Sequence, residues 1–125
     1  MYASFITEKF NNANNNKQSG FTNVKDPYNE FHIYKLDWNS KRVRFLVDDV
    51  QYFEYVNDGK NDYATWPYNG FTKPFQFNGE YSLILNLGVG GTFISNGKSR
   101  VNQVDDSVFP KEVVIDYIRQ YAPNN

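Results

Sequence analysis

Several features that mark particular classes of protein are absent from this chain of 125 residues. It contains no cysteine, so disulfides and thiolate metal ligands are excluded, although this leaves the compartment open. Its net charge is −1, which gives no electrostatic basis for binding nucleic acid or an anionic membrane. No segment approaches the ~20 apolar residues of a membrane span, and the first residues lack the pattern of a signal peptide. We therefore expect neither nucleic acid nor a membrane as a partner.

Aromatic and amide side chains are, in contrast, abundant. Aromatic residues make up 18% of the chain, and the sequence contains seventeen asparagines. This composition suits sugar binding, because rings stack on pyranose faces and amides pair with hydroxyl groups. It suits a β-rich protein nearly as well, since such proteins place Tyr and Phe in strands and Asn in turns.

Short alternating segments separated by turns predict an all-β protein. Residues 31–38, 42–48 and 50–56 each alternate between an apolar and a more polar face, and tight turns separate them. Successive short strands of this kind indicate a β-sandwich or jelly roll. The length fits one domain, 1–125, with neither an internal repeat nor a linker.

The remaining segments complete this prediction. Residues 80–91 form a nearly continuous apolar run closed by glycines, which is typical of a strand covered on both faces. Asn86 lies at its centre, so its amide must find hydrogen-bond partners or face a wet groove. We expect a closing strand at 113–121, a first strand at 2–10 and a solvated loop at 11–17.

Three segments, in the same order and at similar spacing, resemble glycoside hydrolase family 16. Phe31-His-Ile-Tyr-Lys-Leu-Asp-Trp38 with Val43-Arg-Phe-Leu-Val-Asp48 is similar to the family's strand pair F-H-x-Y-x-x-x-W and I-x-W/F-Y-V-D-G. Leu83-Ile-Leu-Asn-Leu-Gly-Val-Gly-Gly91 resembles L-I-L-N-L-A-V-G-G, and Phe109-Pro110 with Val114-Ile-Asp-Tyr-Ile-Arg-Gln-Tyr121 resembles the closing F-P-x-x-M-x-V-D-Y-V-R-V-Y. The resemblance, closest to the laminarinase branch, implies a concanavalin A-like jelly roll, a β-1,3-glucan ligand and a secreted or cell-surface location.

The catalytic motif of that family is missing from this sequence. The family carries an E-x-D-x-E or E-x-D-x-x-E strand, and retaining hydrolysis needs its two glutamates ~5–5.5 Å apart as nucleophile and general acid. No such spacing occurs here. In the family this strand lies just before the segment that matches Met1 to Thr7. The chain therefore resembles the carboxy-terminal half of the domain, and we expect an incomplete sandwich that is inactive alone.

Two smaller departures concern the groove and a turn. The family continues after the catalytic strand with V-H-x-T-x-H, whose second histidine faces the groove, and Ile6 stands at that place here. Asp49 stands where the family's hairpin has glycine, and aspartate tolerates the left-handed conformation at some cost.

Three residues are candidates for sugar contacts. Trp66, before Pro67 in an irregular segment, either stacks on sugar or packs in the core. Asn86 matches the groove-facing amide of the family's strand, or it is a hydrogen-bonded core amide. Phe93 is either a groove wall or a loop anchor.

Two further residues have a metal-binding or a structural interpretation. Asp116 matches an aspartate that binds calcium in many family members, but calcium takes six to eight oxygens, and the family's other ligands lie in the missing half. Calcium is therefore possible at Asp116, and no other cofactor is expected. His32 is the only histidine, and we interpret it as structural because no motif supplies a Ser or Cys partner.

Three hypotheses follow. The chain is part of a β-glucanase whose catalytic carboxylates lie on a segment not present, or it is a non-catalytic binding module for β-1,3-glucan. In the third, it is a structural or assembly subunit whose half-sandwiches pair through open strand edges, with a complementary chain or by self-association, and sugar binding is irrelevant.

Overall fold

The computed structural model describes residues 1–60, 64–66, 82–88, 107 and 109–121. The chain divides into two compact units, Met1–Tyr81 and Ser82–Asn125, and each is described by itself. The regular elements of the described residues are all β-strands, which confirms the all-β prediction. None of these residues belongs to a helix of the length and apolarity that crossing a membrane requires.

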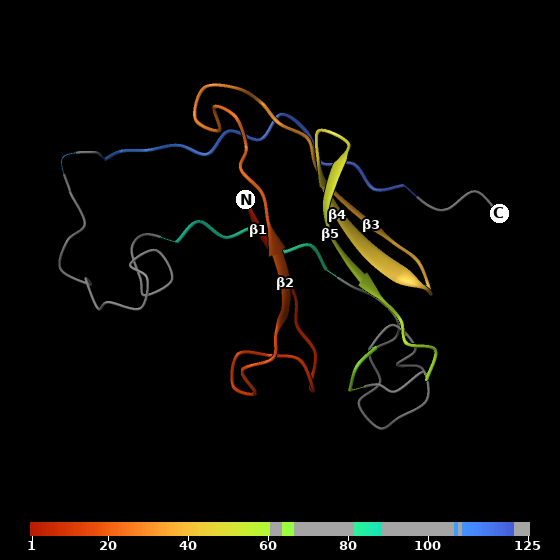
Figure 1. Cartoon of the computed structure of the whole chain (residues 1–125). Helices are drawn as coiled ribbons and strands as arrows, with labels where there is room; N and C mark the ends of the chain where they lie inside the picture. The colour runs from red at the N-terminus through yellow and green to blue at the C-terminus, as the bar shows by residue number, and fades with distance from the viewer. Residues whose placement is uncertain (61–63, 67–81, 89–106, 108, 122–125) are drawn as a thin grey trace. The chain divides into compact units, whose positions relative to one another are not determined.

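Five strands form two antiparallel sheets in the first unit (Figure 1). β1 (Tyr2–Phe5) pairs with β2 (Gln18–Phe21) in one sheet, while β3 (Tyr34–Trp38), β4 (Arg42–Val47) and β5 (Val50–Val56) form a meander. The three strands of the meander lie where alternation predicted them. The first strand is shorter than predicted, because an asparagine-rich turn begins soon after it.

Side-chain amides hold this asparagine-rich turn together. Asn11 Nδ2 donates to the carbonyl oxygens of Thr7 (3.3 Å) and Glu8 (2.8 Å). Asn11 Oδ1 accepts from the backbone N–H of Asn14 at 2.9 Å. Asn14 Nδ2 in turn donates to the carbonyl oxygens of Glu8 and Lys9. These amides satisfy backbone groups locally, as Asn side chains do in turns, so the segment needs no strand partner.

Two tight turns set the register of the meander. Between β3 and β4, Asn39 Oδ1 accepts from the backbone N–H groups of Lys41 (2.9 Å) and Arg42 (3.1 Å). Between β4 and β5, Asp48 and Asp49 have φ angles of 49° and 64°. A type I′ turn requires positive φ at both central residues, so Asp49 occupies a position that favours glycine.

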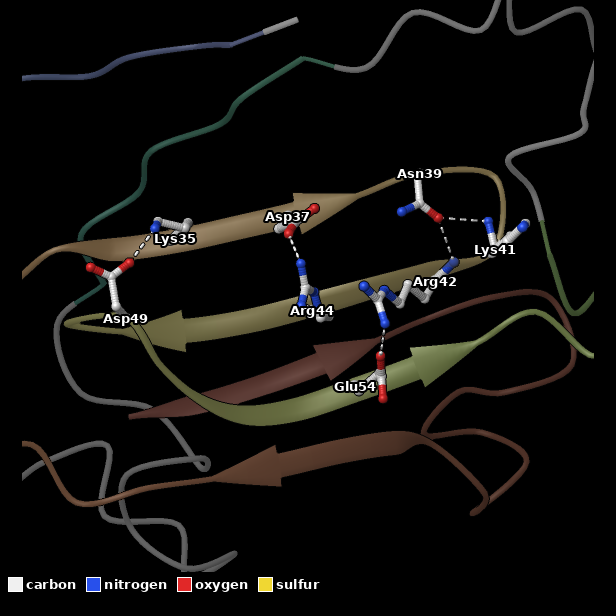
Figure 2. A network of polar contacts seen from close by, with 8 residues as sticks. All are labelled: Lys35, Asp37, Asn39, Lys41, Arg42, Arg44, Asp49 and Glu54. Carbon is white, nitrogen blue, oxygen red and sulfur yellow. Dashed lines mark hydrogen bonds and ion pairs between the residues drawn. The ribbon is translucent and has the colours of Figure 1, made fainter. Parts of the chain in front are cut away.

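One face of the meander carries a row of ion pairs (Figure 2). The pairs are Lys35 with Asp49, Arg44 with Asp37, and Arg42 with Glu54. Because opposite charges face each other across neighbouring strands, they support the register, although each exposed pair contributes only ~0.2–1 kcal/mol.

The other face of the meander packs against the β1–β2 hairpin through stacked rings. The rings of Phe5 and Tyr55 stack with centroids 4.2 Å apart, and the Trp66 ring stacks on both at 5.7 and 5.8 Å. The other buried apolar side chains of the described residues are Ala3, Val43 and Val47. Each aromatic pair adds ~0.5–1.5 kcal/mol beyond the area it buries, so this ring cluster joins the two sheets.

The backbone of β2 passes directly over Phe53 on β5. A Cβ atom built on Gly20 would lie 2.8 Å from the Phe53 Cβ atom and 3.1 Å from its ring, closer than real Cβ atoms come. Glycine at position 20 is therefore required by the packing of the hairpin on the meander.

The second unit departs from the sequence prediction. Its described residues, 82–88, 107 and 109–121, contain no strand, and their large apolar side chains are exposed. The strands expected at 80–91 and 113–121 are therefore not confirmed within these ranges. Apolar composition favours a strand but does not supply the neighbouring strand that a ladder requires.

Replacing Gly20 with alanine should lower the free energy of unfolding by about 1–3 kcal/mol, because the added methyl group forces Phe53 or the backbone of β2 to move. Urea unfolding followed by tryptophan fluorescence measures this change. Gly88→Ala is the matched control: a Cβ there meets no atom within 4 Å, so a change within ~0.5 kcal/mol is expected. Equal stability of the G20A variant and the parent would contradict the close approach.

Replacing Asp49 with glycine should raise the free energy of unfolding by up to ~1 kcal/mol, because glycine adopts positive φ without strain. The lost pair with Lys35 is exposed and offsets little of this gain. Asp48→Gly is the control at the neighbouring position, and it should be destabilising because it removes hydrogen bonds to His32 and Ile33. Urea unfolding of the two variants tests this contrast, and the expectation is wrong if they shift stability alike.

Candidate functional site

Trp66 lies in the interior of the first unit. Its side chain is 1% exposed, and the rings of Phe5 and Tyr55 stack on it. The adjacent carbonyl of Thr65 accepts a hydrogen bond from the Tyr55 hydroxyl at 2.9 Å, which fixes the segment against β5. Of the two alternatives for Trp66, this placement corresponds to packing. Sugar stacking by Trp66 stays a prediction that requires the ring to leave this position.

The other predicted site residues lie in the second unit. Asn86 and Asp116 are both exposed, and Phe93 lies outside the described residues. Among the residues that the structure describes, no three His, Asp or Glu side chains are grouped so that they could hold a metal ion. Calcium at Asp116 stays a prediction, since that ion takes six to eight oxygens and the described residues supply no such group around it.

The acidic side chains of the meander are engaged in contacts that maintain the fold. Asp37 and Glu54 pair with arginines, Asp49 pairs with Lys35, and Asp48 contacts His32. A retaining glycosidase needs two carboxyls facing one sugar, one of them free to attack. The contacts of these four acids instead serve strand register and turn geometry.

The outward side of the β1–β2 hairpin gathers a different set of side chains. Ala3 is buried and Phe5 is in the ring cluster, so alternation places Tyr2 and Ser4 on the opposite face. Their register partners on β2 are Phe21 and Ser19, which lie on the same face. We call Tyr2, Ser4, Ser19 and Phe21 the hairpin outer face.

Polar contacts arrange the hairpin outer face. The Tyr2 hydroxyl donates to Ser19 Oγ at 2.8 Å, and Lys17 Nζ lies 5.1 Å from the centroid of the Tyr2 ring. The hydrogen bond with Ser19, followed by the neighbouring Lys17, lowers the pKa of Tyr2 from its ordinary 10.0. Tyr2 is 37% exposed and Phe21 74% exposed. The face therefore offers two aromatic rings beside hydroxyl and ammonium groups.

This combination is suited to a carbohydrate. Aromatic rings cover the apolar face of a pyranose, while hydroxyl and ammonium groups hydrogen-bond its hydroxyls. Phe21 was not predicted as a site residue, because β2 is short and contains Gly20, so its alternation is weak. The sequence did hold one indication of this face: Ile6 matches a groove-facing position of the family, and Tyr2 and Ser4 lie on the same side of an extended strand as Ile6.

Comparison with family models gives a match to "Glycosyl hydrolases family 16" over residues 3–77. A solved structure, that of SCLam, a non-specific endo-β-1,3(4)-glucanase from family GH16, superposes with a TM-score of 0.53 at 31% sequence identity. That similarity covers 54% of this chain and 26% of the other. The neighbour is a jelly roll, which confirms the predicted fold class.

Curated relatives point in the same direction. A β-glucanase of Rhodothermus marinus is 31% identical and covers 97% of this chain and 39% of the relative. The clotting factor G alpha subunit of Tachypleus tridentatus is 29% identical, over 87% of this chain and 13% of the relative. A β-1,3-glucan-binding protein of Penaeus monodon is 31% identical, over 50% and 19%. The chain spans less than half the length of these relatives.

Proposed function

Because this chain belongs to glycoside hydrolase family 16, we propose that it is part of a protein that binds β-1,3-glucan of the laminarin type. The observation that carries the proposal is the family match over residues 3–77, a range that takes in most of the hairpin outer face. Relatives named as a β-glucanase and a β-1,3-glucan-binding protein support this ligand class.

The hairpin outer face supplies the proposed contacts. Tyr2 and Phe21 are register partners, so their rings form one platform on which a pyranose can stack. The hydroxyls of Ser4 and Ser19 lie along the same face and can accept or donate to sugar hydroxyls. Asn86 and Phe93, in the second unit, stay proposed sugar contacts by family resemblance, separately from the hairpin outer face.

Hydrolysis is proposed to depend on carboxylates that this sequence does not hold. The chain lacks the E-x-D-x-x-E pattern, and the described acids of the meander are engaged in the fold. In this proposal a glucanase is completed by a segment or complementary chain that carries the nucleophile and the acid. The corresponding location is extracellular or at the cell surface.

A non-catalytic glucan-binding module is the second candidate. Relatives named as a β-1,3-glucan-binding protein and as Gram-negative bacteria-binding protein 1 of Drosophila melanogaster favour it. Assembly through open strand edges, with sugar binding irrelevant, is the third. Titration of the purified chain with laminarin and with an α-linked glucan of similar mass separates this third candidate from the other two: both binding hypotheses expect laminarin-selective affinity, and assembly expects none.

Tyr2→Ala and Phe21→Ala should each weaken laminarin binding about tenfold, or ~1.4 kcal/mol, because each removes one ring of the platform. Isothermal titration calorimetry measures this loss. Tyr28→Ala is the matched control, since Tyr28 is an exposed aromatic residue that does not belong to the hairpin outer face. A similar loss in all three variants would refute the platform as the binding surface.

The purified chain alone should release no reducing ends from laminarin, because its sequence lacks the E-x-D-x-x-E pattern that sets two carboxyls at the required separation. A reducing-sugar assay checks this, with an active β-1,3-glucanase as the positive control. Release that disappears when one of this chain's own glutamates or aspartates is replaced by its amide would overturn the expectation. Laminarin binding without release would still support glucan recognition.

A further inference from the structure

The only histidine of the chain connects a loop to a hairpin turn. His32, whose side chain is 11% exposed, lies just before β3, and its Nδ1 is 2.7 Å from Asp48 Oδ2 in the β4–β5 turn. Asp48 Oδ1 accepts from the backbone N–H of Ile33 at 2.9 Å, and the Asp48 N–H donates to the Ile33 carbonyl at 3.0 Å. Asp48 thus fastens residues 32–33 to the turn.

The two nitrogens of the imidazole have different surroundings. Nδ1 contacts Asp48, whereas Nε2 is buried and makes no hydrogen bond within the part of the chain that the structure describes. The hydrogen bond to Asp48, and to a smaller extent the backbone of Lys25 and Asp26, raise the pKa of His32 and so favour the protonated ring.

The protonation state of His32 decides how strongly the ring binds Asp48. Neutral imidazole that donates from Nδ1 to Asp48 carries a lone pair on Nε2, which cannot bond to a carbonyl oxygen. In imidazolium both nitrogens are donors and the ring is charged, so the contact of Nδ1 with the Asp48 carboxylate becomes an ion pair. Protonation therefore strengthens the hydrogen bond between His32 and the turn, because it becomes charge-assisted on both sides.

Among the described residues, few other hydrogen bonds hold the loop at residues 22–33. At one end the Thr22 N–H donates to the Met1 carbonyl at 2.9 Å, and at the other end Ile33 is held by Asp48. In between, the carbonyl of Asp26 accepts from the N–H groups of Asn29 and Glu30, which closes a local turn. His32 follows this local turn in the chain, and its side chain contacts Asp48 of the β4–β5 turn.

We propose that His32 is a pH-operated clamp, which holds loop 22–33 on the β4–β5 turn when it is protonated and releases the loop when it is neutral. The clamp needs no glucan and is independent of the proposed function. Its parts are the imidazole, the Asp48 carboxylate and the backbone of Ile33, which the same carboxylate holds.

The pH range follows from the two partners. The hydrogen bond to Asp48 raises the pKa of His32 above its ordinary 6.5, so its stabilisation is complete below 6.5 and is lost as pH rises through the folded-state value. The hydrogen bond from His32 lowers the pKa of Asp48 below its ordinary 3.8, so its contribution is complete above 3.8. The clamp is tightest between these two ordinary values.

Other charged or titratable groups surround the clamp. Tyr34 on β3 has its ring centroid 6.4 Å from that of His32, and Asp49 in the turn pairs with Lys35. Lys25, Asp26 and Glu30 belong to the loop. None of these is a histidine, so His32 is the group expected to change charge near neutral pH.

The experiment combines two measurements on the full chain. Imidazole NMR signals give the pKa of the single histidine without assignment ambiguity. Hydrogen-exchange mass spectrometry, corrected for the intrinsic rate at each pH, gives the protection of loop 22–33. We expect a His32 pKa above 6.5 and about a threefold or larger loss of loop protection as pH rises through it.

Asp48→Asn is the informative variant, because asparagine keeps an oxygen for the Ile33 N–H and tolerates positive φ, yet removes the charge. It should return the His32 pKa toward 6.5 and shift or abolish the pH dependence of loop protection. Glu30→Gln, a charge change in the same loop, should leave both measurements as in the parent. A parent pKa at or below 6.5, or loop protection that ignores His32 titration, overturns the clamp even if the D48N variant fails to fold.

Discussion

The stacking of Phe5, Tyr55 and Trp66 is the interaction on which the described sheets depend. A two-stranded hairpin is marginal by itself in water and needs a packed face to persist. The ring cluster provides that face for β1 and β2, and Gly20 allows their backbone to come close enough to Phe53 for the cluster to form. β5 of the meander contributes Tyr55 to this cluster.

This packing also decides which side chains are available for recognition. Successive side chains of a strand point to opposite faces, so the neighbours of an inward-facing residue on β1 face outward. Because Ala3 and Phe5 lie on the inner side of β1, Tyr2 and Ser4 lie on its outer side, next to their register partners Phe21 and Ser19 on β2. A charged face in the meander and an aromatic, hydroxyl-bearing face on the hairpin thus arise from one common core.

The sequence predicted the parts of this structure that depend on local pattern. β3, β4 and β5 alternate strongly and are joined by turn residues, so their positions were foreseeable. Trp66 was ambiguous, because a tryptophan beside a proline gives no periodicity to show whether its ring packs or is displayed. Phe21 was missed because β2 contains glycine and little alternation. The segments around Asn86 and Asp116 read as strands, yet pairing depends on partners far away in the sequence.

In the asparagine-rich turn after β1, aspartate, the closest isostere of asparagine, cannot replace Asn11. Its side chain donates to two carbonyl oxygens and accepts from one N–H, and only a carboxamide does both at once. Deamidation would exchange the donating nitrogen for a charged oxygen facing the Thr7 and Glu8 carbonyls. Deamidation of Asn11 would therefore disrupt the asparagine-rich turn.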